Sequence, residues 1–214
     1  MKPLCRPILL LVLTGLIAIT GCAKIKELGK EFDPSKRPED QTYQEAITPF
    51  ISKGSVYHGP ATQILIKSLS LTKAVREAMV KRQAQAFALS ARAEEKLLQD
   101  QMAAADQAFE LMVSAYVPSR EWNDLNAKKP DWRIYLVNKK GDRLEPIDVR
   151  YIKERTPLNQ VLYPFWSPWD KLFSLRFAKN LPDGTPFLAD QEYKARLLVA
   201  GPPGSEEMTI ILLP

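Results

Sequence analysis

Beyond residue 108 the chain alternates between hydrophobic and polar residues with a period of two, which is typical of strands that bury one face. Six runs show this pattern, at 109–117, 132–136, 147–151, 173–177, 193–199 and 208–212. A further apolar run, at 64–69, precedes them. Turn-forming sequences such as KKGD and GPPG separate several of the runs. The pattern predicts about seven short antiparallel strands, as in a β-sandwich.

Residues 72–107 interrupt this pattern with a stretch that contains neither proline nor glycine. Alanine, lysine, arginine, glutamate and glutamine dominate it, and all of them are good helix formers. Ser90 is placed to cap a second helix, with Glu94 and Glu95 near its N-terminus. We therefore predict a helical hairpin of 72–88 and 91–106, with one long helix as the alternative. Its basic residues are expected on a solvated face: Lys73, Arg76, Lys81 and Arg82.

Together these runs predict a mainly β chain with an α insertion, of the α+β class. The expected architecture is an immunoglobulin-like antiparallel β-sandwich of about seven strands over residues 51–214, with the helical hairpin inserted at about 72–107. The Cys-Trp-Cys framework of true immunoglobulin domains is missing from the sequence. The expected similarity is therefore one of architecture alone.

The first 21 residues have the layout of an export signal. Lys2 and Arg6 precede a nearly continuous apolar run at 8–19, and small residues follow it. The run is shorter than the roughly 20 apolar residues that a membrane-spanning helix requires. Residues 22–50, in contrast, are rich in charged residues and are interrupted by prolines, which favours a flexible tether. Packing of residues 43–51 against the domain is the alternative.

The end of this signal, Ile19-Thr20-Gly21-Cys22, resembles the lipobox of bacterial lipoproteins, which has an aliphatic residue, two small residues and a cysteine. Ile19 departs mildly from the leucine that is commonest there. The resemblance implies that the Cys22 thiol becomes a diacylglyceryl thioether, that residues 1–21 are removed, and that the new amino group is acylated, for example with palmitate. It also implies, from Ala23 in place of an aspartate, an anchor in the outer membrane facing the periplasm. In a source with one membrane, the anchor would lie on the outer face of the cell membrane.

A lipid-modified Cys22 would leave the mature chain without a free thiol. Cys5 is the other cysteine of the chain, and it would leave with the signal. A disulfide, a thiol enzyme and a cysteine-ligated metal are then excluded. Lys2 and Arg6 account for two of the five net positive charges, and the charge that remains is too small to favour nucleic acid. The expected partner is therefore the membrane, through acylated Cys22.

Candidate catalytic and metal-binding residues are few. His58 is the single histidine of the chain, whereas a metal site usually takes several ligands, and the aspartates form no calcium-binding loop. The Gly-x-Ser-x-Gly, His-Glu-x-x-His and phosphate-loop motifs are all missing. We therefore expect no metal and no cofactor. The enzymatic alternative is an envelope hydrolase that uses carboxylates and His58.

The most unusual segment is LYPFWSPWDKLF, at 162–173. Tyr163, Phe165, Trp166 and Trp169 surround two prolines there, and rigid aromatic side chains make good recognition surfaces because they lose little entropy on contact. The alternative, which we favour, is that the segment crosses between the sheets and plugs one end of the sandwich. The sequence thus predicts a non-catalytic binding or structural module of the cell envelope, with an envelope protein or a glycan as the candidate partner.

Overall fold

The computed structural model describes residues 38–120 and 122–213. The expected signal at 1–21, the lipobox with Cys22 and the first part of the expected tether lie outside these residues. Residues 43–214 form one compact unit, which contains every described strand. Residues up to Thr42 belong to a separate unit.

The described chain begins with helix α2 (Pro38–Ile47) and the short helix η2 (Thr48–Phe50), where the sequence predicts a tether. For residues 43–50 the tether prediction is wrong and the alternative of packing is correct, because Tyr43 is 4% exposed and Ile47 is fully buried. The remaining elements are β1 (Ile51–His58), β2 (Ala61–Ser70), α3 (Lys73–Phe87), α4 (Ala91–Gln107), β3 (Phe109–Tyr116), β4 (Arg133–Val137), β5 (Arg143–Leu144), β6 (Asp148–Ile152), α5 (Pro157–Leu162), β7 (Lys171–Phe177), β8 (Lys194–Gly201) and β9 (Gly204–Ile211).

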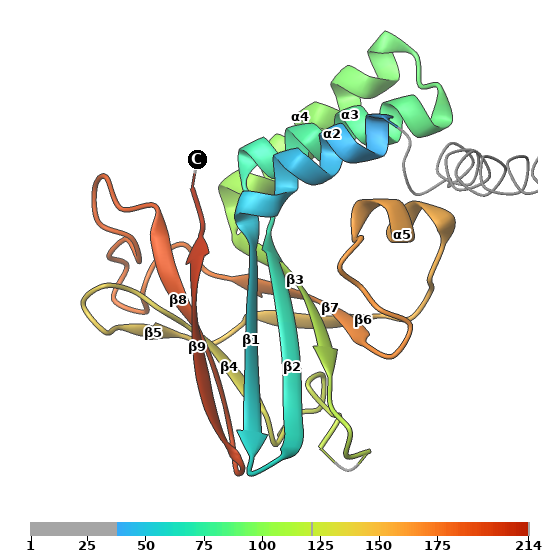
Figure 1. Ribbon diagram of the computed structural model, residues 1–214. Helices are drawn as coiled ribbons and strands as arrows, with labels where there is room; N and C mark the ends of the chain where they lie inside the picture. The colour runs from blue at the N-terminus through green and yellow to red at the C-terminus, as the bar shows by residue number, and fades with distance from the viewer. Residues whose placement is uncertain (1–37, 121, 214) are drawn as a thin grey trace, which may run out of the picture. The chain divides into compact units, whose positions relative to one another are not determined.

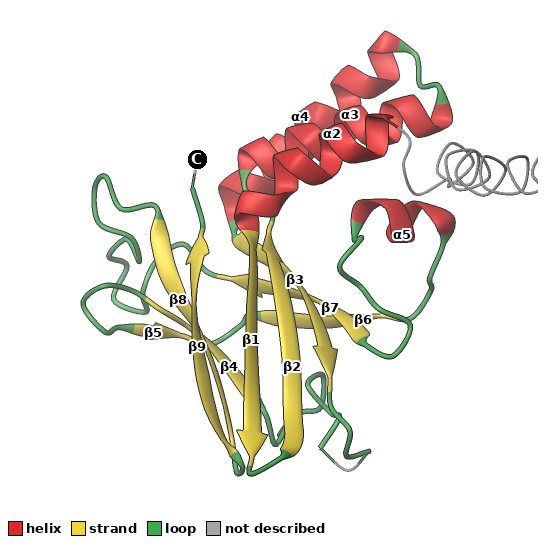
Figure 2. Cartoon of the chain, in the orientation of Figure 1, coloured by secondary structure: helices red, strands yellow, loops and turns green. Residues whose placement is uncertain are grey.

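The strands form two antiparallel sheets (Figure 1, Figure 2). One sheet has five strands in the order β1-β2-β3-β7-β6, and the other has four in the order β5-β4-β8-β9. The described residues are therefore α+β, as predicted, with nine strands rather than about seven. The added strands are β1 and β5. Neither shows the expected alternation, because β1 is largely polar and β5 has two residues.

The first core lies between the two sheets and contains the residues that the period-two pattern predicts to be buried. On β3, β4, β7 and β9 these are Phe109, Leu111, Val113, Ala115, Ile134, Leu136, Phe173, Leu175, Phe177, Met208 and Ile210. The pattern is wrong at two positions, since Ile147 is 63% exposed and Tyr193 is 49% exposed. Both residues lie just before the strands to which they were assigned.

Strands β1 and β9, which end the two sheets, lie side by side (Figure 1). Ser52 Oγ donates a hydrogen bond to the carbonyl of Thr209 at 2.6 Å. A Cβ added to Gly54 would come within 2.7 Å of Glu206 Cγ and 2.8 Å of Met208 Sδ, both closer than atoms can pack. Glycine at this position therefore allows the two sheets to meet along one side of the sandwich.

The helical hairpin is present where the sequence predicts it, between β2 and β3. Thr72 caps α3 by accepting from the Val75 amide, and Ser90 caps α4 by accepting from the Ala93 amide, as its position predicts. Ala88 ends α3 in the left-handed conformation, with φ of 48°, so one long helix is excluded. The ends of the hairpin meet, because the Leu71 amide donates to the Glu110 carbonyl at 2.9 Å.

The hairpin also supplies part of a second core, on the outer face of the five-stranded sheet. This core brings together residues of α2, α3, α5, three strands and two connecting segments: Tyr43, Ile47, Leu69, Leu71, Val75, Met112, Leu162, Trp166 and Leu172. The helices therefore cover the sheet, and α3 packs against it through Val75, which is fully buried.

Two arginines of α3 are buried, although the sequence predicts a solvated basic face. Arg76 and Arg82 are 2% and 5% exposed. Arg76 donates to the Leu71 carbonyl at 3.0 Å, to Gln101 Oε1 at 2.6 Å and to Glu110 Oε2 at 2.8 Å. A buried guanidinium needs partners of this kind, because its charge is costly to remove from water. The bonds of Arg76 tie α3 to α4 and to β3.

Candidate functional site

His58 lies at the tip of the β1–β2 hairpin, where Gly59 turns the chain with φ of 57°. Its side chain is exposed, and it is not among the residues that line five cavities of residues 38–120 and 122–213. Among these residues no group of three His, Cys, Asp or Glu side chains could hold a metal ion. The described residues therefore place His58 on an exposed turn, away from these cavities.

The aromatic segment connects α5 to β7 on the outer face of the five-stranded sheet. The expectation that it crosses between the sheets is wrong, because β6 and β7 are neighbours in one sheet. It packs instead in the second core, against the helices. Tyr163 and Phe165 are half-buried there, with their rings edge to face at 6.3 Å.

Trp166 is the buried anchor of this segment, with 5% of its surface exposed. Its Nε1 donates to the Asp170 carbonyl at 2.9 Å. The guanidinium of Arg155 lies 4.6 Å from the centre of its ring and donates to the Trp166 carbonyl at 3.1 Å. The indole is thus packed on one side and covered by a cation on the other.

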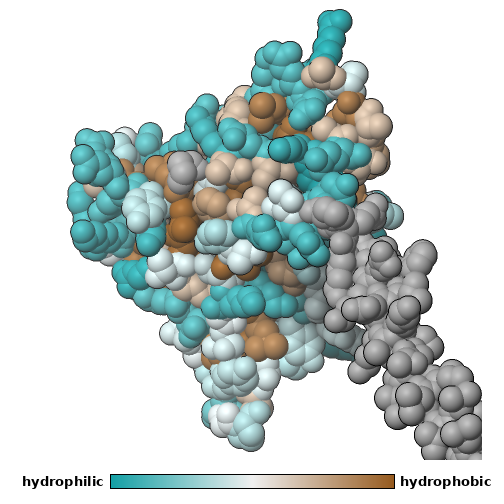
Figure 3. Space-filling model, turned by 45° about the horizontal axis from the view of Figure 1, so that its top comes forward, coloured by the Kyte–Doolittle hydropathy of each residue, from teal (hydrophilic) through white to brown (hydrophobic). Residues whose placement is uncertain are grey.

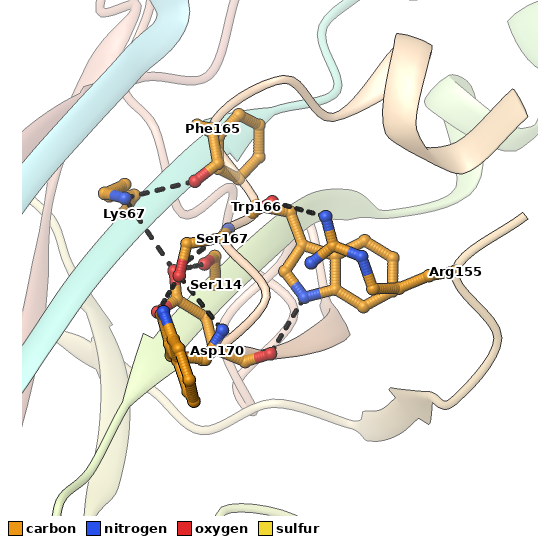
Figure 4. A network of polar contacts seen from close by, with 8 residues as sticks. Lys67, Ser114, Arg155, Phe165, Trp166, Ser167 and Asp170 are labelled. Atoms are coloured by element: carbon orange, nitrogen blue, oxygen red, sulfur yellow. Dashed lines mark hydrogen bonds and ion pairs between the residues drawn. The ribbon is translucent and has the colours of Figure 1, made fainter. Parts of the chain in front are cut away.

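The carboxylate of Asp170 fixes the turn that follows Trp166 (Figure 4). Oδ2 accepts from Ser114 Oγ at 2.7 Å and from the Ser167 amide at 3.3 Å, and Oδ1 accepts from Ser167 Oγ at 2.8 Å. Lys67 Nζ lies 3.7 Å from Oδ2 and donates to the Phe165 carbonyl at 3.1 Å. These bonds attach residues 165–170 to β2 and β3 through charge-assisted contacts.

Trp169 points out of this fixed turn, with 81% of its surface exposed. Its amide donates to Ser167 Oγ at 3.2 Å, so its backbone belongs to the bonded network while its side chain does not. On the face drawn in Figure 3, the described residues show brown patches separated by teal ones, so apolar surface there is scattered. Scattered apolar residues are ordinary on protein surfaces. What distinguishes Trp169 is that its backbone is held in place.

Two half-buried side chains lie at the same end of the sheet as Trp169. In the β2–β3 ladder Lys67 pairs with Ser114 and Leu65 pairs with Tyr116. The two pairs lie on the same face, because each is two residues from the other on both strands. Trp169 precedes β7, whose first residue Lys171 pairs with Ala115 beside Tyr116. Leu65 and Tyr116 are half-buried. We call Leu65, Tyr116 and Trp169 the Trp169 surface.

Sequence reasoning found the aromatic residues of this site and missed the polar ones. The spacing of Trp166 and Trp169 is compatible with opposite orientations, but nothing local shows which indole is buried. Which indole is buried depends on four polar residues, Lys67, Ser114, Arg155 and Asp170. Ser114 lies 56 residues from Asp170 in the sequence. The one local signal was Ser167 with Asp170, since a serine hydroxyl and a nearby carboxylate often bond within a turn.

Two tyrosines of the second core should make the fold sensitive to alkali. Burial, with the nearby Glu110 charge, raises the pKa of Tyr163 from 10.0 to about 12. Burial also raises the pKa of Tyr43, whose hydroxyl donates to the Leu162 carbonyl at 2.8 Å. In the unfolded chain both phenols would ionise near pH 10. Their stabilising effect is therefore complete below about pH 10 and is lost as the pH rises towards 12.

We accordingly expect the free energy of unfolding, measured in denaturant, to fall between about pH 10 and 12. The free energy of unfolding of Tyr163→Phe should fall less steeply over this window, because phenylalanine cannot ionise. Phenolate absorbance should show that both phenols ionise above pH 10. A flat stability profile across the window would contradict the assignment.

No described helix is both long enough and apolar enough to cross a membrane. Comparisons with protein-family models, curated protein sequences and solved structures gave no match. A function for this chain therefore has to be inferred from its own residues.

Proposed function

We propose that the chain is an exported lipoprotein, anchored through acylated Cys22 to the outer membrane and facing the periplasm, whose domain is a non-catalytic binding module. The support for the anchor is the sequence of residues 1–22, with its basic start, its short apolar run and the Ile19-Thr20-Gly21-Cys22 box. Two or more acyl chains on one residue provide stable anchoring, because each buried methylene contributes about 0.8 kcal/mol.

We also propose that the domain is immunoglobulin-like. The orders β2-β3-β7-β6 and β5-β4-β8-β9 match the ABED and C′CFG sheets of that architecture if β2 is strand A. Trp132, which is fully buried just before β4, corresponds to the buried tryptophan of strand C. On this assignment β1 is an added edge strand and the hairpin is an insertion between strands A and B. The architecture alone assigns no function.

The observation that carries the binding proposal is the 81% exposure of Trp169 on a turn whose backbone is fixed. A tryptophan is the commonest kind of binding hot spot, and a pre-organised one loses little entropy on contact. Half-buried Leu65 and Tyr116 supply neighbouring apolar area. Such a surface fits the pocket of a partner protein.

A glycan partner is the less favoured alternative. Sugar recognition needs polar groups beside the aromatic ring that are free to bond hydroxyls. The Asp170 side chain, the polar group next to Trp169, is only 9% exposed and accepts hydrogen bonds from Ser114 and Ser167. Both serine hydroxyls donate in these bonds. The polar groups of the turn therefore hold its shape, and the side chain that a partner would contact is Trp169.

The anchor is tested by Cys22→Ala. We expect this variant to lose metabolic labelling with palmitate and to move from the membrane fraction to the soluble fraction, because no thiol remains for the diacylglyceryl group. Cys5→Ala is the matched control, and it should keep both properties. Palmitate labelling and membrane retention that survive in Cys22→Ala would contradict the anchor.

The binding proposal is tested by cross-linking from intact cells. A photoreactive residue at position 169 should cross-link to a discrete envelope protein, and the same residue at position 57 should not. Tyr57, 56% exposed at the tip of the β1–β2 hairpin, provides the matched aromatic control. With the identified partner, Trp169→Ala should weaken binding roughly 30-fold or more, the effect of a hot-spot residue, while Tyr57→Ala should leave it unchanged.

Two results would count against a protein partner. Cross-links to glycan fragments alone would favour the glycan. Equal binding by wild type and Trp169→Ala would show that the Trp169 surface is not a recognition site.

A further inference from the structure

A cavity of about 270 Å³ opens between the two sheets on the side away from the β1–β9 contact. Ile134 of the four-stranded sheet lines it, with Trp132 just before that strand, and so do Val149 and Leu175 of the five-stranded sheet. Val149 pairs with Leu175 in the β6–β7 ladder, so both side chains point towards the opposite sheet. The interior of the cavity is therefore an extension of the first core.

The short strand β5 explains why this side is open. It pairs with Leu136 and Val137 of β4, and its ladder does not reach Ile134. Strand β6 ends the five-stranded sheet on the same side. The two sheets thus lack here the close contact that joins β1 to β9, and Glu145 and Pro146, which connect β5 to β6, form one wall of the cavity.

The mouth of the cavity is positively charged. Lys128, Lys129 and Arg133 line it, against the single acid Glu145. All four side chains are exposed, and none of them forms an ion pair with another residue of the described ranges. Among the side chains that line the cavity, three cations stand against one carboxylate, and this excess of positive charge in the lining attracts anions. Asp124 and Asp131, on the segment that carries the lysines, lie outside the lining.

We propose that this cavity, the β6-edge cavity, binds a small organic anion with an apolar body, such as an aryl or short alkyl carboxylate. The interior removes the apolar body from water, and the lysines and Arg133 bind the carboxylate with charge-assisted hydrogen bonds. A dry cavity of about 150 Å³ holds benzene, so this one accommodates roughly ten non-hydrogen atoms. The acyl chain of a membrane lipid is too large for it. The site is separate from the Trp169 surface and does not depend on the proposed function.

The charge of the ligand is tested with phenylacetate and its neutral analogue phenylacetamide. The full chain in mild detergent is titrated with each compound by calorimetry, and detergent alone corrects for partition into micelles. We expect phenylacetate to bind saturably. Phenylacetamide should bind at least roughly tenfold more weakly. No saturable binding of phenylacetate, or equal binding of the two compounds, would overturn the proposal.

The place of the ligand is tested with two pairs of substitutions. The double variant Lys128→Gln with Lys129→Gln should bind phenylacetate roughly tenfold more weakly. Its affinity for phenylacetamide should be unchanged, because the two substitutions remove charge from the mouth alone. Lys139→Gln with Lys140→Gln, on an exposed turn outside the cavity, is the matched control and should change neither. Equal loss of phenylacetate binding in both pairs would show that net charge, and not this mouth, attracts the anion.

Filling the cavity gives a further test that does not alter charge. Val149→Phe places a larger apolar side chain at a half-buried position of the edge strand β6. If the variant unfolds cooperatively, as the wild type should, it should no longer bind either compound. Undiminished binding in the folded variant would place the ligand elsewhere. Should this variant fail to fold, the two lysine pairs, which change exposed side chains, still decide the proposal.

Discussion

Trp166→Ala is expected to lower the free energy of unfolding by about 3–5 kcal/mol, the usual cost of truncating a buried aromatic side chain. The indole is 5% exposed in the second core, and its loss would leave a cavity beneath the helices. It would also remove the hydrogen bond to the Asp170 carbonyl and uncover the guanidinium of Arg155. Part of the cost therefore comes from polar groups that lose their partners.

Trp169→Ala is the matched control, since it removes the same side chain three residues away. With 81% of that side chain exposed, we expect its effect on the free energy of unfolding to stay within about 0.5 kcal/mol. Denaturant unfolding of the two variants, followed by circular dichroism, measures the difference. Near-wild-type stability of Trp166→Ala would mean that the aromatic segment is not part of the core.

Replacing residues 72–107 with a short Gly/Ser loop is expected to abolish cooperative unfolding. Closing the chain would not itself prevent folding, because Leu71 and Glu110 are close enough for a short connection and the cost of loop closure depends only weakly on length. The loss of the second core is what we expect to prevent it. Without α3, the side chains of Leu69 and Met112 lose the cover of Val75, and Glu110 loses the buried guanidinium that pairs with it.

A shorter replacement separates the role of the hairpin base from that of its tip. Residues 85–88 and 90–93 are exposed, so a Gly/Ser loop in place of 85–93 should leave a cooperative transition close to that of the wild type. Calorimetry of the two variants gives the comparison. A sharp transition after removal of 72–107 would show that the sheets fold without α3, and that the hairpin is a true insertion.

Features that arise from neighbouring residues could be predicted from the sequence. The period-two pattern identified the buried residues of β3, β4, β7 and β9 because alternate side chains of a strand share a face whatever the strand pairs with. The hairpin and its Ser90 cap followed for the same reason, since the capping bond joins residues three apart. The prediction of exposed arginines on α3 failed, because the burial of Arg76 depends on Glu110, 34 residues away.

Features that arise from distant residues were decided by the tertiary structure. Strand β1 is largely polar, and it is a strand because β2 pairs with it and β9 lies beside it. The same holds for the aromatic segment. Its sequence shows several rigid rings, but the bonds of Asp170 to Ser114 and of Arg155 to Trp166 determine that Trp166 is buried and Trp169 is exposed. Such contacts form only after the strands are paired, and they leave no periodic pattern in the sequence.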